Sequence, residues 1–164
     1  MTDGGSSIPE VHALLATLVA AKPGGRFAET GTAFGKGARA IAEAMDERAS
    51  FVTVELDPDR YEQAVAALSG TRAEAVLGYW HEVLPHRAPF DLLFADGGVR
   101  ETEGGFELLI SLLAPGGILV KDDMSPGRPI DGDEIREWLL CDPRLSAAEV
   151  MTTPTTAAII ATRR

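Results

Sequence analysis

The chain has a single cysteine and no long hydrophobic run. Cys141 is the only cysteine among 164 residues, so no disulfide can form within the chain, and this usage fits a reducing compartment. The apolar stretch at residues 11–21 is interrupted by His12 and Thr17 and is too short to span a bilayer. We therefore expect a cytoplasmic protein without a membrane segment.

Positive charge is also scarce. Fifteen Lys and Arg residues stand against 25 Asp and Glu residues, which gives a formal net charge of −10. Nucleic acids and anionic membrane surfaces select a basic footprint, so we expect neither as a partner. The opening residues, MTDGGSSIPE, lack the basic region of a secretory signal peptide, and we expect residues 1–7 to be disordered.

Helical and extended patterns alternate along the rest of the chain, residues 8–164, with no linker that would divide it. Pro9 suits the first turn of a helix that Ser7 could cap, and KPGG at residues 22–25 ends that helix. We expect later helices over residues 36–48, from Pro58 onward, over 105–113 and over 130–140. Strands are expected at residues 26–30, 50–56, 74–78, 90–96, 117–123, 145–151 and 156–162.

This alternation predicts an α/β fold with three layers, a sheet between two layers of helices. The sheet is expected to be doubly wound and Rossmann-like, with seven mostly parallel strands. The short link TTPT between the last two strands predicts an antiparallel hairpin at the C-terminus. We expect one domain over residues 8–164.

Carboxylates stand at the ends of four of the first five expected strands. Glu29, Glu55 and Asp96 stand at the ends of the first, second and fourth strands, and Asp122 with Asp123 stands at the end of the fifth. Ligands of open α/β sheets bind at this edge. An acid after a strand is also a common helix cap, and Asp57 before Pro58 fits that simpler role.

The stretch AETGTAFGKGARAI places Glu29 directly before a glycine-rich turn. Such turns usually bind phosphate, which a carboxylate would repel. The spacing of Gly31, Gly35 and Gly37 matches neither the dinucleotide fingerprint nor a P-loop, which argues against an NAD-dependent oxidoreductase. Glu55 is placed to bind a ribose diol. A ligand with a ribose and an ammonium group but no phosphate fits these features.

S-adenosylmethionine is such a ligand, and the chain here resembles the class I methyltransferases. The resemblance runs from Arg26 to the C-terminus and is strongest to the small O-methyltransferases related to catechol O-methyltransferase. ETGTAFGKGA resembles the first motif of that family and VELDPDRYEQA the second, while FDLLFADG and LLAPGGILVKDD resemble the fourth and fifth. Each motif alone is weak, but four occur in order at the expected spacing.

The resemblance implies a set of cofactor-binding residues. Gly78, Tyr79 and Trp80 are expected to border the adenine, where relatives usually carry an acid in place of Tyr79. Ordinary core packing is the alternative role for Trp80. The full predicted set is Glu29, Thr30, Gly31, Thr32, Phe34, Gly35, Gly37, Glu55, Leu56, Gly78, Tyr79, Trp80 and Asp96.

Metal-dependent relatives bind magnesium through an Asp after the fourth strand and an Asp-Asn pair after the fifth. The resemblance therefore implies that Asp96, Asp122 and Asp123 hold Mg²⁺ or Ca²⁺, both of which prefer oxygen ligands. Asp123 stands where the family has Asn, and Val99 stands where it has a catalytic Lys. The alternative is that Asp122 and Asp123 only cap the next loop.

The candidate catalytic residues are Asp96, Asp122 and His81. A histidine near the cofactor can act as a general base, although a solvated loop histidine is the simpler interpretation of His81. The expected reaction is O-methylation of a small-molecule hydroxyl with help from a divalent metal. A metal-independent methyltransferase on another nucleophile and a cofactor-binding module without turnover remain alternatives, and a homodimer that covers the site stays open.

Overall fold

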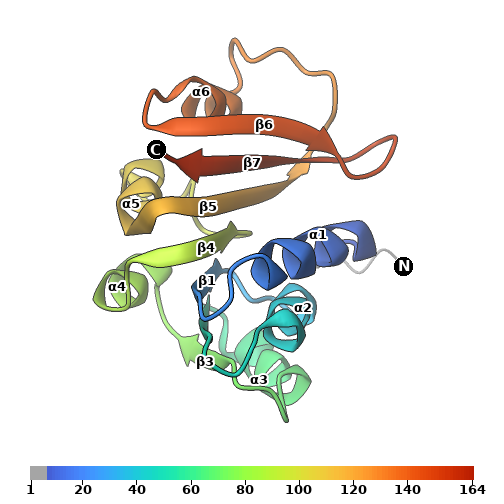
Figure 1. The fold of residues 1–164 in the computed structure, drawn as a ribbon, viewed down its shortest axis with the longest axis vertical. Coiled ribbons are helices and arrows are strands. Elements are labelled where there is room, and N and C mark those ends of the chain that lie inside the picture. The colour runs from blue at the N-terminus through green and yellow to red at the C-terminus, as the bar shows by residue number, and fades with distance from the viewer. Residues whose placement is uncertain (1–6) are drawn as a thin grey trace.

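The computed structural model describes residues 7–164 (Figure 1). Residues 1–6, which make up most of the segment expected to be disordered, lie outside the described residues. Ser7 is buried, and its hydroxyl oxygen lies 3.0 Å from Nε2 of His12. Helix α1 (Pro9–Ala20) begins with Pro9 in its first turn, as expected. Its N-cap is Ile8 and not Ser7, because the Ser7 hydroxyl forms its hydrogen bond with His12.

The sheet has seven strands in the order β3-β2-β1-β4-β5-β7-β6. The first five strands run parallel to one another, and β7 is antiparallel to both of its neighbours, β5 and β6. The predicted fold class is therefore confirmed. The strands are β1 (Arg26–Thr30), β2 (Ser50–Glu55), β3 (Glu74–Leu77), β4 (Phe90–Ala95), β5 (Leu113–Met124), β6 (Leu145–Met151) and β7 (Ala157–Arg163).

Helices cover both faces of the sheet (Figure 1). Helices α1, α2 (Lys36–Ala44) and α3 (Pro58–Ala67) lie over one face, and α4 (Trp80–Val83), α5 (Gly105–Leu112) and α6 (Glu134–Cys141) lie over the other. Two hydrophobic cores result, because successive strand residues point to opposite faces. Phe27 of β1 packs in the core with α1 and α2, while Ala28 belongs to the core with α4 and α5.

The strand order reverses between β1 and β4. From β1 the chain continues to β2 on one side, and β4 later pairs with the other side of β1. The turns after these two strands are hydrogen-bonded to each other. The backbone N–H of Gly97 donates to the carbonyl oxygen of Thr30 at 2.9 Å, and Thr30 Oγ1 donates to the carbonyl oxygen of Gly97 at 2.8 Å. This reversal is where ligands bind in open α/β sheets.

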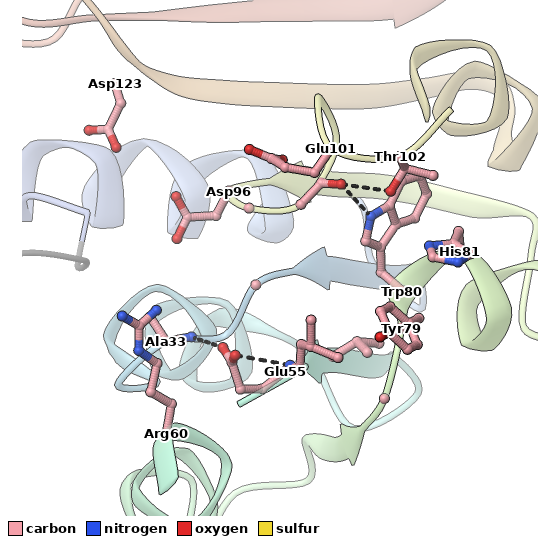
Figure 2. A pocket seen from close by; sticks show the side chains of 16 residues that line it. Ala33, Glu55, Arg60, Tyr79, Trp80, His81, Asp96, Glu101, Thr102 and Asp123 are labelled. Atoms are coloured by element: carbon pink, nitrogen blue, oxygen red, sulfur yellow. Dashed lines mark hydrogen bonds between the residues drawn. The ribbon is translucent and has the colours of Figure 1, made fainter. Parts of the chain in front are cut away.

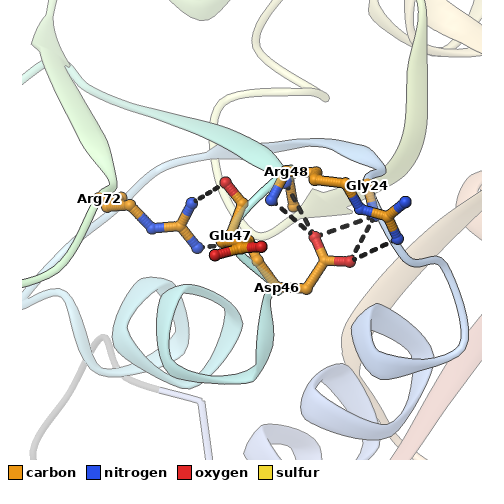
Figure 3. A network of polar contacts seen from close by, with 6 residues as sticks. Gly24, Asp46, Glu47, Arg48 and Arg72 are labelled. Atoms are coloured by element: carbon orange, nitrogen blue, oxygen red, sulfur yellow. Dashed lines mark hydrogen bonds and ion pairs between the residues drawn. The ribbon is translucent and has the colours of Figure 1, made fainter.

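The second helix ends earlier than the sequence pattern predicts. Helix α2 stops at Ala44, four residues before Arg48, because the Asp46 carboxylate takes over the nearby backbone donors (Figure 3). It accepts hydrogen bonds from the N–H groups of Gly24 and Arg48 at 3.0–3.1 Å. Arg72 donates to the backbone carbonyl of Asp46. The turn thereby joins the α1–β1 loop to the end of α2.

Three further segments differ from expectation by more than one residue. Helix α6 begins at Glu134 and not Ile130, because Asp133 caps it by accepting the N–H of Arg136 at 3.2 Å. Strand β5 begins at Leu113, four residues before the expected start. The segment expected to be a polar loop forms α4 and a 3₁₀ turn, η1 (Leu84–His86), so His81 lies on a helical turn. Within the described residues, no helix is both long and apolar enough to cross a bilayer.

Candidate functional site

A cavity of about 540 Å³ opens at the carboxyl ends of the parallel strands (Figure 2). Its volume lies within the range of about 300–1,000 Å³ that is typical of small-molecule sites. The carboxyl ends of β1 to β5, or the turns that follow them, all contribute to its wall. Nine of the residues predicted from the sequence line it, namely Gly31, Glu55, Leu56, Gly78, Tyr79, Trp80, His81, Asp96 and Asp123.

Glu55 is buried at the end of β2, where its carboxylate binds three backbone N–H groups of the turns that border the cavity. Its Oε2 accepts the backbone N–H of Ala33 at 2.7 Å, and its Oε1 accepts those of Leu56 and Asp57, each at 2.9 Å. A carboxylate offers about four acceptor positions, so three backbone donors leave one for a ligand hydroxyl. Asp57 itself caps α3 by accepting the N–H groups of Asp59 and Arg60, as predicted.

Aromatic side chains form one end of the cavity. Trp80 is 5% exposed, and its Nε1 donates to the carbonyl oxygen of Gly98 at 3.1 Å. Trp80 packs in the core, which was the alternative role, and it also lines the cavity, while its place beside an adenine stays a prediction. Tyr79 is 50% exposed, and its ring centroid lies 5.3 Å from that of His81. Nδ1 of His81 is buried without a hydrogen-bond partner among residues 7–164.

Glu29 lies beneath the glycine turn and does not line the cavity. It is 1% exposed, and its carboxylate accepts a hydrogen bond from the hydroxyl of Thr53. Burial raises the pKa of Glu29 well above its ordinary value, and the nearby carboxylates of Asp96, Asp122 and Glu55 raise it further. Burial and these charges thus shift the equilibrium of Glu29 toward its neutral form, and a nearby cation would oppose that shift.

The other residues of the predicted turn pack in the wall behind the cavity. Thr30 and Thr32 are buried, and the hydroxyl oxygen of Thr32 lies 2.5 Å from that of Thr53. A Cβ on Gly35 would lie 3.1 Å from Cβ of Ala67, and a Cβ on Gly37 would lie 3.1 Å from Oε1 of Glu29. Phe34 lies under the guanidinium of Arg60, 5.9 Å from ring centroid to Cζ. These residues support the site and do not line it.

Three carboxylates meet at the other end of the cavity. Oxygen atoms of Asp96, Asp122 and Asp123 all lie within 4.8 Å of one another. In Figure 2, Asp96 and Asp123 lie at the opposite end from Tyr79 and His81. Asp122 is 1% exposed, and neither of its carboxylate oxygens has a hydrogen-bond partner among the described residues. Buried oxygens without donors are a feature that a bound cation would explain.

The pKa values of two of these carboxyl groups, Asp96 and Asp122, are raised. Burial raises the pKa of Asp96 to about 7, and the Asp122 charge adds to this shift. Burial likewise raises the pKa of Asp122 to about 6, although the Lys121 ammonium opposes that change. Nζ of Lys121 lies 3.8 Å from Oδ1 of Asp122 and 3.4 Å from the backbone oxygen of Asp96. Lys121 is thus the nearest cation to the three carboxylates among the described ion pairs.

Two departures from the resemblance have structural counterparts. Asp123 adopts a φ of 60°, a left-handed conformation that Asp and Asn adopt more readily than other side chains. The backbone at this position therefore accommodates either residue. Val99, which stands where the resemblance implies a catalytic lysine, is 5% exposed and packs in the core with Phe106 and Leu109.

A family model described as a methyltransferase domain matches residues 28–124. The chain belongs to this methyltransferase family. The match covers the cavity from Gly31 to Asp123, including both the glycine turn and the three carboxylates. The resemblance to class I methyltransferases is thereby confirmed.

Solved structures share the fold of this methyltransferase. The O-methyltransferase from Bacillus cereus, in complex with SAH, has a TM-score of 0.81 at 19% identity, covering 98% of this chain and 84% of that one. The O-methyltransferase TomG from Streptomyces achromogenes, in complex with SAM, has a TM-score of 0.75 at 22% identity, covering 99% and 83%.

A curated relative matches the methyltransferase over a shorter stretch. The protein-L-isoaspartate O-methyltransferase of Pyrobaculum neutrophilum is 32% identical over 128 residues, which cover 72% of this chain and 58% of that protein. The chain therefore matches little more than half of the length of that relative.

Sequence reasoning missed several residues that line the cavity of the methyltransferase. Two of them, Gly97 and Gly98, carried a usable signal because they directly follow Asp96 at the end of β4. Arg60 reaches the cavity from the first turn of α3, and no spacing rule indicated this. The remaining missed residues are Ala33, Val54, Glu101 and Thr102.

Proposed function

We propose that the protein transfers a methyl group from S-adenosylmethionine to a hydroxyl group of a small molecule, assisted by a divalent cation. The observation that carries this proposal is one cavity with two chemically different ends. Glu55 and Tyr79 line it where a nucleoside would bind, and Asp96 and Asp123 line it where a cation and an acceptor would bind. The SAM and SAH complexes of the similar structures support the choice of cofactor.

Residues of this chain would position the cofactor as follows. Glu55 offers its remaining acceptor position to the ribose diol, while Tyr79 and Trp80 flank the adenine. Gly31 lets the ligand approach the turn after β1 closely, because no side chain stands there. An ammonium group near this turn would lower the pKa of Glu29 and favour its charged form.

The chemistry of the three carboxylates fits Mg²⁺ or Ca²⁺. Asp96, Asp122 and Asp123 would supply three oxygen ligands, and Asp122 has two buried oxygens without donors among the described residues. A cation bound there would lower the pKa of an acceptor hydroxyl and orient it toward the methyl group. The three carboxylates lie at a fixed distance from the nucleoside end of the cavity. An acceptor hydroxyl bound at them would therefore be positioned for methyl transfer, and such positioning lowers the activation barrier.

A metal-independent reaction, in which a side chain of the protein serves as the base, is the second candidate. The environment of Asp96 makes it a better candidate for this base than His81. A group with a pKa of about 7 can accept a proton from a hydroxyl near neutral pH, and Asp96 has such a pKa. His81 lies at the nucleoside end of the cavity in Figure 2. The isoaspartate methyltransferase relative suggests a further acceptor for this candidate, a carboxyl group.

Calorimetry with S-adenosylhomocysteine and with NAD tests the first step of the proposal. We expect the former to bind and the latter not to bind. Transfer of a radiolabelled methyl group from S-adenosylmethionine to a panel of phenols, alcohols and isoaspartyl peptides then tests turnover, with Mg²⁺ or with EDTA. Binding without transfer to any acceptor would favour a cofactor-binding module, and equal transfer in EDTA would favour the metal-independent reaction.

A further inference from the structure

A second cavity, of about 310 Å³, adjoins the first at the end with the three carboxylates. The two cavities share Asp123, which lies in the wall of both. The β4–α5 loop also separates them, because Arg100 lines the second cavity and the next residue, Glu101, lines the first. Asp123, one of the three carboxylates, therefore lies at the boundary between the two cavities.

Three arginines line this second cavity, although the chain as a whole has a net charge of −10. One of them, Arg136, is structural. It is 1% exposed, its Nε and Nη2 donate to Glu149 at 2.7 and 2.9 Å, and it also donates to Asp133 and to the backbone oxygen of Ser125. Its donors are thus committed, and its single positive charge offsets only part of the charge of Asp133 and Glu149.

The other two arginines, Arg100 and Arg128, have donors to spare. Among residues 7–164, the ion pair of Arg100 is with Glu134, with 3.7 Å between Nε and Oε2, and both side chains are 62% exposed. An exposed pair at this distance contributes little. Arg128 is exposed and forms no hydrogen bond or ion pair within residues 7–164, apart from a through-space interaction with Asp133.

The guanidinium groups of Arg100 and Arg128 have unused hydrogen-bond donors and lie in the cavity beside the three carboxylates. Such groups are suited to binding a small planar anion. The planar fork of a guanidinium matches the two oxygens of a carboxylate. Asp123, Asp133 and Glu134 line the same cavity as the three arginines, so its lining carries no net charge that would favour a dianion such as a phosphate over a singly charged group. A carboxylate therefore fits the charges of this cavity better than a phosphate.

We propose that the methyl acceptor carries a carboxylate, which Arg100 and Arg128 bind in the second cavity while its hydroxyl group lies at Asp96, Asp122 and Asp123. This inference rests on the proposed function, because it assigns the methyl-accepting end to the first cavity. It adds the substrate class, a hydroxy acid. No covalent step is involved at the arginines, which act only by binding and orientation.

Binding of two matched probes tests this inference without any need for turnover. The probes are 3,4-dihydroxybenzoate and its neutral amide, 3,4-dihydroxybenzamide, titrated into the protein with S-adenosylhomocysteine and Mg²⁺ and followed by calorimetry. We expect the wild type to bind the acid about tenfold more tightly than the amide, because only the acid forms charge-assisted hydrogen bonds. The preference should vanish in Arg100→Gln/Arg128→Gln and return in part in Arg100→Lys/Arg128→Lys.

The double variant Arg39→Gln/Arg48→Gln is the control for net charge, because both arginines are exposed and neither lines a cavity. It should keep the wild-type preference. Equal or undetectable binding of the two probes to the wild type would overturn the inference, as would a preference that survives in Arg100→Gln/Arg128→Gln. Failure of S-adenosylhomocysteine to bind would instead count against the proposed function, and the two probes are then compared on the protein alone.

Discussion

Gly31 and Gly97 lie against each other where the strand order reverses. A Cβ atom placed on Gly31 would lie 2.9 Å from both Cα and N of Gly97, closer than real Cβ contacts come. Gly31 also has a φ of 77°, which side chains other than glycine rarely adopt. This contact holds the turn after β1 against the turn after β4, and both turns line the cavity.

Replacing Gly31 by alanine should therefore lower stability and abolish binding of S-adenosylhomocysteine. Gly70→Ala is the matched control, since Gly70 has a φ of 79° but a Cβ added there would have no atom within 4 Å. In the control, the free energy of unfolding should fall only by the cost of a left-handed backbone at alanine, about 1–2 kcal/mol. Gly31→Ala should lose about 1–3 kcal/mol more from the clash with backbone atoms. Equal loss in chemical denaturation of the two variants would contradict the close contact.

Glu55→Ala should weaken binding of S-adenosylhomocysteine by about 1–3 kcal/mol, because a ribose hydroxyl would lose its acceptor. The loss should be smaller for the 2′,3′-dideoxy analogue, which cannot donate to Glu55 in either protein. Calorimetry with both ligands on both proteins gives the coupling energy between Glu55 and the ribose hydroxyls directly. Glu62→Ala, on the exposed side of α3, removes the same charge and should bind like the wild type. A coupling energy of zero would remove Glu55 from the ribose site.

Divalent cations should raise the melting temperature of the wild type, because they bind the folded state at the three carboxylates. The gain should vanish in Asp122→Asn/Asp123→Asn. Asp59→Asn/Glu62→Gln removes two exposed charges from α3 and should keep the full gain, which separates specific binding from charge screening. Differential scanning fluorimetry with Mg²⁺, Ca²⁺ or EDTA measures this, and an unchanged melting temperature in all three would leave the carboxylates without a metal.

Stability without metal should fall as pH rises from about 5 to 8. The pKa values of Asp122 and Asp96 in the folded state are about 6 and about 7, above the ordinary 3.8, so the folded state binds more protons than the unfolded state in this window. Stability must then fall with pH until both groups are ionised in both states. Thermal melts in EDTA should show a shallower fall in Asp96→Asn and Asp122→Asn than in Asp59→Asn. Equal slopes would contradict the raised pKa values.

The fold could be predicted from the sequence because its signals are local and agree with one another. Strands such as β1 and β6 have apolar patterns bounded by turn residues, and the structure reproduces their predicted ends. The boundaries that failed differ in kind, because the start of α6 follows a local cap, Asp133, whereas the end of α2 also involves a long-range bond. Helix α2 ends where Asp46 meets Gly24, 22 residues away in the chain, and no local pattern encodes that contact.

The candidate site was predictable at the strand ends and not between them. Glu55 and Asp96 follow strands, so the sheet itself brings them to one edge. Arg60 and Thr102 reach the cavity from α3 and from the β4–α5 loop, whose paths are set by packing. The sequence also placed Glu29 in the cofactor site on account of its charge. The structure places it behind the turn, because the alternation along β1 points it to the side of Thr53.

A crystal structure with S-adenosylhomocysteine and Mg²⁺ would show whether one cavity holds both the nucleoside and the cation. We expect density for the ligand in the cavity of about 540 Å³, with the ribose diol at Glu55 and the adenine beside Tyr79 and Trp80. We also expect an ion bound by oxygens of Asp96, Asp122 and Asp123. A ligand bound outside this cavity, or one whose ribose lies away from Glu55, would overturn the proposed cofactor site.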